Sequence, residues 1–157
     1  MDHHLRRLIE GRVLEEIEPN DQAILGYWTK ARRAFADSRL PETSMEGAVD
    51  RAYQAAFLLA TAVVHAAGYR VRGREGGHHY NTFYALGGLD DPQLARLAGE
   101  LNDLRATRHE ALYEAIAGPD EDDLGRMQQA VEDLLVSGRE WLVSRQPSLS
   151  DRIGTQP

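Results

Sequence analysis

Apolar residues recur every three or four positions along most of the chain, which is the period of an α-helix. The first such stripe covers residues 5–17 and stops before Pro19. A second stripe covers residues 24–35, with Asn20 or Asp21 in position to cap the start of its helix. No segment shows the two-residue alternation of a half-buried strand. We therefore expect an all-α protein.

The longest apolar segment predicts a helix at the centre of that protein. The sequence "EGAVDRAYQAAFLLATAVVHAAG" is small and apolar on nearly every side, which is typical of a helix surrounded by others. Thr43 or Ser44 can cap its start, and Gly68 stands where a C-terminal cap glycine belongs. We expect this helix to continue through Ala67.

Three more helices follow in the pattern. The segment "HHYNTFYAL" predicts a short helix that ends at Gly87-Gly88. Asp91-Pro92 then predicts a capped helix that continues to about Ala117, where Gly118-Pro119 breaks it. The acids at 120–123 open a last long helix, because negative charge is favoured in a first turn.

The helices together predict one bundle. We expect a single domain over residues 1–147, an antiparallel bundle of four to five helices with an additional N-terminal helix. The polar tail at 148–157 is predicted to be disordered. The longest apolar run contains His65 and is too short to span a bilayer, and the N-terminus lacks the apolar core of a secretory signal. These features favour a cytoplasmic protein with no membrane partner.

Composition excludes several kinds of functional site. The chain has no cysteine, which excludes disulfides, thiolate metal sites and a cysteine nucleophile. It contains no phosphate-binding or dinucleotide-binding glycine motif, and its histidines lack the spacing of a zinc or di-iron site. We therefore expect neither a metal nor a cofactor. The net charge is −7, so a nucleic-acid partner would have to bind a local basic patch.

Arg108 stands on the apolar seam of the helix that follows Pro92, where leucines occupy the preceding seam positions. A charge on such a seam must be paired or hydrogen-bonded. One interpretation is a structural ion pair with Asp50 or Glu132. The other is that the bundle opens here into a cleft and Arg108 faces an anion.

A file of polar residues lies beside Arg108. Arg105, His109 and Tyr113 follow one another at four-residue spacing, which places them on one helix face. Two guanidinium groups, an imidazole and a phenol suit a phosphate group, because arginine presents a planar fork to its oxygens and histidine can exchange a proton near neutral pH. The alternative is a solvated helix face supported by neighbouring acids.

A basic island precedes the short helix. In a chain of net charge −7, the segment "GYRVRGREGGHHYN" carries a single acid. Its glycines let a ligand approach the backbone, and its tyrosines can stack on bases. The alternative is a solvated loop. The candidate anion-binding residues are Arg70, Arg72, Arg74, His78 and His79.

The order of these features resembles the HEPN family of small prokaryotic α-helical proteins. The resemblance covers residues 48–117. It consists of the alanine-rich helix "RAYQAAFLLATAVVHAAGYR", the loop and short helix "GGHHYNTFYALGGL", and the arginine-bearing helix "LNDLRATRHEALYE". It implies a bundle of four to five helices that pairs as a homodimer. It also implies a toxin–antitoxin or defence module, in which many members are metal-independent ribonucleases beside a nucleotidyltransferase partner.

The catalytic signature of that family is an arginine, four to six residues, and then a histidine. Here Tyr113 follows Arg108 at that spacing, and His109 follows Arg105 after only three residues. Arg105 and His109 could act as a shortened motif, or a histidine of the 78–79 pair could supply the imidazole. We favour a third interpretation, a nucleotide- or RNA-binding protein with a degenerate catalytic motif. The alternatives are a ribonuclease toxin using Arg105, Arg108 and His109, or a helical protein-interaction module without a nucleic-acid role.

Overall fold

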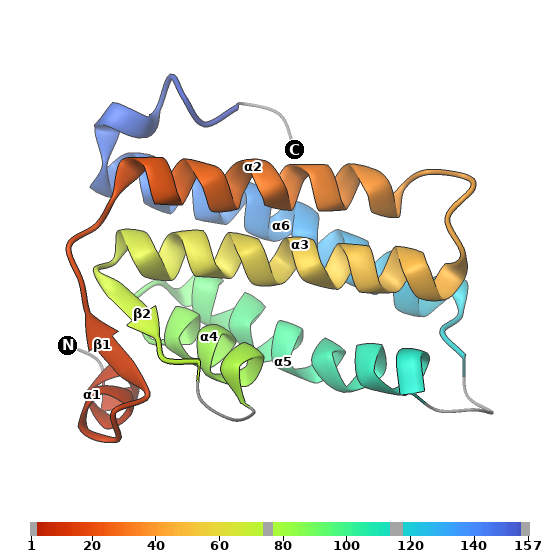
Figure 1. Cartoon of the computed structure of the whole chain (residues 1–157), viewed down its shortest axis with the longest axis horizontal. Helices are drawn as coiled ribbons and strands as arrows, with labels where there is room; N and C mark the ends of the chain where they lie inside the picture. The colour runs from red at the N-terminus through yellow and green to blue at the C-terminus, as the bar shows by residue number, and fades with distance from the viewer. Residues whose placement is uncertain (1–2, 74–76, 114–117, 155–157) are drawn as a thin grey trace.

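The chain folds into a mostly helical structure, as its apolar period predicts (Figure 1). The computed structural model describes residues 3–73, 77–113 and 118–154, without the side chains of 110–112. In chain order the elements are α1 (His3–Glu10), β1 (Leu14–Glu16), α2 (Asp21–Ser38), α3 (Met45–Ala66), β2 (Tyr69–Val71), α4 (His78–Gly87), α5 (Pro92–Tyr113), α6 (Glu121–Arg145) and a 3-10 turn (Pro147–Leu149). The end of the predicted helix at 114–117 lies outside the described residues.

Side-chain caps fix where the long helices begin. Oxygens of Asn20, Ser44, Asp91 and Asp120 each accept a hydrogen bond from the backbone N–H three residues later. Such caps satisfy N–H groups that have no partner within a helix. At the other end of α3, Gly68 has a φ of 91°, the left-handed conformation that favours glycine. The predicted starts of α2, α3 and α5 and the end of α3 are therefore confirmed.

α3 is the central helix, as predicted. It packs against α2 and α6 on one side and against α4 and α5 on the other (Figure 1). Twelve of its 22 residues are buried, most of them alanines, so neighbouring helices can approach closely. The close approach continues on α6, where a Cβ at Gly138 would lie 3.4 Å from Val63 and 3.5 Å from Trp28. Among the described helices, none is both long and apolar enough to cross a bilayer.

A two-stranded sheet corrects the prediction for the N-terminal segment. The first helix ends at Glu10 rather than continuing to Ile17, because Arg12 adopts a φ of 57° that no helix contains. The chain then forms β1, which pairs antiparallel with β2 so that Leu14 lies opposite Val71. Strands of three residues are too short to establish a two-residue period, and the sequence pattern therefore did not reveal them.

The C-terminal segment is also more ordered than predicted. Residues 148–154 do not extend freely from the bundle, because Leu149 and Ile153 are almost fully buried. Ser148 lies 3.2 Å from the carboxylate of Asp21 at the start of α2. Two apolar side chains in an otherwise polar tail were enough to hold it against the bundle. Residues 155–157 lie outside the described range.

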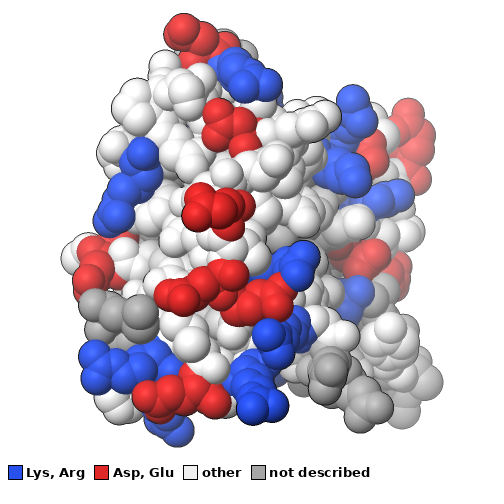
Figure 2. Space-filling model, turned by 60° about the vertical axis from the view of Figure 1, so that its left-hand side comes forward, with Lys and Arg blue, Asp and Glu red and all other residues white. Residues whose placement is uncertain are grey.

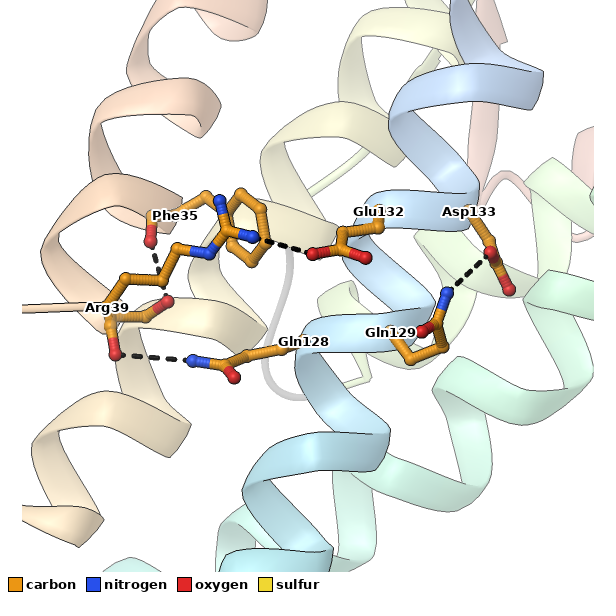
Figure 3. A network of polar contacts seen from close by, with 7 residues as sticks. Phe35, Arg39, Gln128, Gln129, Glu132 and Asp133 are labelled. Carbon is orange, nitrogen blue, oxygen red and sulfur yellow. Dashed lines mark hydrogen bonds and ion pairs between the residues drawn. The ribbon is translucent and has the colours of Figure 1, made fainter. Parts of the chain in front are cut away.

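Polar contacts tie the end of α2 to α6 (Figure 3). A guanidinium nitrogen of Arg39 lies 2.7 Å from a carboxylate oxygen of Glu132, and the side-chain amide of Gln128 donates to the carbonyl of Ser38. Both partners of the ion pair are well exposed, so its contribution to stability is about 0–1 kcal/mol. Glu132 is thus bound to Arg39, which leaves Asp50 as the predicted partner for Arg108.

Candidate anion-binding cleft between helices α4 and α5

A cavity of about 470 Å³ lies where the start of α4 and the second half of α5 face the middle of α3. We call it the α4–α5 cleft. None of the described residues that line it is acidic, although the chain carries 25 acids against 18 arginines and lysines. The lining residues are Tyr53, Gly77, His78, His79, Tyr80, Arg105, Arg108, His109 and Tyr113.

The cleft brings together most of the residues singled out in the sequence. The predicted file at Arg105, His109 and Tyr113 lines one wall, and His78 and His79 line another. Gly77 directly precedes α4, and its φ of 74° turns the chain so that the two histidines enter the first turn of the helix. The short helix and the arginine-bearing helix therefore contribute to a single site.

Arg108 forms an ion pair and also lines the cleft. Its Nε donates to a carboxylate oxygen of Asp50 at 3.0 Å, so the predicted ion pair with α3 is confirmed. Its guanidinium also lies 5.0 Å from the centre of the Tyr53 ring and lines the cleft. The Arg108 side chain is 26% exposed and that of Asp50 is 38% exposed, so the pair is screened by solvent. We expect it to stabilise the fold by about 1 kcal/mol, below the range for fully buried pairs.

Aromatic rings flank the exposed side of the cleft. The Arg105 guanidinium lies 5.7 Å from the centre of the Tyr80 ring, within the range of a cation–π interaction. The rings of His109 and Tyr113 have centres 4.9 Å apart. Tyr80 and Tyr113 belong to a small group of large apolar side chains that remain exposed. These rings present faces on which a planar ligand group could stack.

The inner end of the cleft holds a tyrosine–histidine pair. The Tyr53 hydroxyl and His79 Nδ1 are 2.9 Å apart, and the donor depends on the His79 tautomer. The His79 ring stacks on Phe57 with a centre-to-centre distance of 4.0 Å. Burial, with a further contribution from the Arg108 charge, lowers the pKa of His79 below its usual 6.5. Burial raises the pKa of Tyr53 to about 12, so its hydroxyl stays protonated at neutral pH.

Sequence reasoning missed Tyr53. It lies in the alanine-rich helix, whose pattern indicates only burial, and nothing in that pattern identifies the helix that its hydroxyl faces. A single tyrosine among alanines was the available signal, because a buried phenol requires a hydrogen-bond partner.

Acidification should destabilise the protein below about pH 6.5. Burial lowers the pKa of both His79 and His65 in the folded chain, so the unfolded chain binds more protons over that range. The free energy of unfolding therefore rises with pH until both states are neutral. Urea denaturation between pH 5 and pH 8 measures this slope. His79→Gln should reduce it. An unchanged slope in His79→Gln would contradict this origin.

The fold places only part of the predicted basic island at the α4–α5 cleft. Arg70 lies on β2 and Arg72 follows directly after it, and both bind Glu15 on β1 rather than lining the cleft. The hydrogen bond from Arg70 is the largest cause of a lowered pKa at Glu15. Arg74 lies outside the described residues. Acidic and basic side chains are interspersed over the face shown in Figure 2.

Comparisons of the chain with protein-family models, with curated proteins and with solved structures give no match. The described residues also contain no group of three or more histidines and acids placed to hold a metal ion.

Proposed function

We propose that the chain is a HEPN-like protein that binds RNA or a nucleotide through phosphate groups in the α4–α5 cleft. One observation carries the proposal: the cleft gathers two arginines and three histidines from two helices, with no acid among the described residues that line it. The chain as a whole is strongly acidic, so this concentration of basic groups is local. Arg108 shares its guanidinium with Asp50, and Arg105 forms no ion pair with a described residue.

A nucleic acid matches this arrangement better than a simple anion does. Arginine forks recognise phosphate oxygens, and the exposed rings of Tyr80 and Tyr113 offer stacking faces for bases. The resemblance of "LRATRHEALYE" to a HEPN arginine helix adds RNA as the expected polymer. A helical interaction module would need neither an acid-free cleft nor exposed rings at its edge.

Fluorescence anisotropy with a labelled single-stranded RNA of mixed sequence tests the proposal. We expect the logarithm of the binding constant to fall with the logarithm of salt concentration by about 0.7 for each phosphate neutralised. Two arginines should therefore give a slope of roughly −1.4. No binding at low salt would contradict the proposal and favour the interaction module.

RNA cleavage is a second candidate function, and His79 is the observation that favours it. Its lowered pKa keeps the imidazole neutral near pH 7, as a general base requires. With the proton on Nδ1, His79 donates to the Tyr53 oxygen and leaves Nε2 free. Nε2 would take the proton of the 2′-hydroxyl, the 2′-oxygen would attack phosphorus, and the bond to the 5′-oxygen would break. Protonated His109 would give its proton to that leaving oxygen.

This candidate predicts a defined product. Incubation of the protein with RNA in EDTA should yield a 2′,3′-cyclic phosphate and a 5′-hydroxyl end, detected by mass spectrometry. His79→Gln and His109→Gln should each lower the rate by about 10²–10⁴-fold, the usual contribution of a general acid or base. His3→Gln is the control, because that side chain is exposed on α1. If the protein binds RNA but does not cleave it, the ribonuclease function is contradicted and RNA binding remains as the proposed function.

The proposal also includes two associations, a homodimer of the chain and a complex with a partner protein. The HEPN resemblance implies a homodimer with two arginine helices facing one another, and a nucleotidyltransferase-type protein in a toxin–antitoxin or defence module. Sedimentation equilibrium at micromolar concentration tests the pairing. A mass corresponding to the 17.6 kDa monomer would exclude a cleft formed between two copies of the chain. RNA binding is measured separately.

A further inference from the structure

We propose that a second cavity, between α2 and the C-terminal segment, binds a small organic phosphate. The cavity has a volume of about 360 Å³ and is separate from the α4–α5 cleft, because α2 lies on the other side of α3 (Figure 1). This inference does not depend on the proposed function. The lining residues are Leu25, Trp28, Thr29, Arg32, Arg33, Phe35, Ala36, Arg39, Arg152 and Gly154.

Among the described residues, most of the charge in this cavity has no partner. Arg39 is neutralised by Glu132, but Arg32, Arg33 and Arg152 form no ion pair or hydrogen bond with any described side chain. No acid is among the described residues that line the cavity. These three guanidinium groups come from two chain segments, and one carboxylate would not neutralise them. A phosphomonoester carries up to two negative charges and presents several oxygens to arginine forks, so it matches the cavity better.

The C-terminal segment holds Arg32 in place. The guanidinium of Arg32 lies directly against Gly154, where an added Cβ would overlap it. The segment is itself anchored, because Leu149 and Ile153 are buried. A guanidinium restrained in this way loses less conformational freedom when it binds an anion.

The inner wall supplies an apolar surface. Trp28 lines it and is only 3% exposed. Leu25 and Phe35 add apolar area beside the arginines. The ligand is therefore expected to carry an apolar or aromatic group as well as the phosphate.

Titration with phenyl phosphate and with inorganic phosphate tests the proposal, monitored by NMR of the two indole N–H signals. Phenyl phosphate should shift the Trp28 signal and leave that of Trp141, which does not line the cavity, unchanged. It should bind at least several-fold more tightly than inorganic phosphate, because its ring covers the apolar wall. Equal affinity for the two probes, or no shift at Trp28, would overturn the proposal.

Variants that each remove one positive charge test whether phenyl phosphate binds in this cavity. Arg32→Gln and Arg152→Gln should each weaken phenyl phosphate binding by about tenfold or more, as expected for a lost charge-assisted hydrogen bond. Arg7→Gln removes the same charge from the exposed face of α1, outside both cavities, and should leave binding unchanged. Thermal unfolding shows whether each variant is folded. Undiminished binding by folded Arg32→Gln and Arg152→Gln would overturn the assignment.

Discussion

Replacing both Arg105 and Arg108 by glutamine should weaken RNA binding by about a hundredfold or more. A hydrogen bond that involves a charged group contributes about 1.5–3 kcal/mol, and each 1.4 kcal/mol is a factor of ten in affinity. Both side chains line the α4–α5 cleft from one helix. Anisotropy titration at a fixed salt concentration measures the loss. The salt dependence should also become shallower, since fewer phosphates are neutralised.

A charge-matched control separates this local effect from the change in net charge. The double variant Arg96→Gln and Arg7→Gln also removes two positive charges. Arg96 lies on the same helix but binds Glu100 and Asp133 outside the cleft. This variant should bind RNA nearly as tightly as the wild type. If the two double variants lose the same affinity, the binding arises from overall charge and the cleft is not the site.

Asp50→Asn distinguishes the structural role of Arg108 from its binding role. An amide does not compete with a phosphate for the Arg108 guanidinium as strongly as the carboxylate does. We expect this variant to lose about 1 kcal/mol of stability, as Arg108→Gln does, while its RNA affinity stays equal or rises. A purely structural ion pair predicts matching losses of stability in the two variants and no change of RNA affinity in either.

The sequence predicted local features of the fold better than distant contacts. Apolar period and capping residues are set by neighbours three or four positions apart, and the positions of Asn20, Ser44 and Asp91 therefore identified where helices start. The three-residue strands were missed, because pairing over about 55 residues leaves no local pattern. The same long-range pairing brings Glu15 to Arg70.

In the candidate site, too, local features were predicted and contacts between distant segments were not. Helix register alone placed Arg105 and His109 on one face, and it also placed Arg108 where an ion pair was required. Register could not show that His79 would reach the same cleft, because that depends on how α4 packs on α5. It also gave no sign of Tyr53, whose role arises from a contact between α3 and α4.

Leu59→Ala should lower the free energy of unfolding by about 2–5 kcal/mol, the range measured for buried leucines whose removal leaves a cavity. Leu59 is fully buried in the central helix, where the surrounding alanines have no longer side chains to fill the space. Many proteins have only about 5–15 kcal/mol of stability in total, so this loss is large. Leu40→Ala removes the same atoms from a side chain that is 51% exposed, and it should have little effect. Urea denaturation measures both variants, and similar losses in the two would contradict the central position of α3.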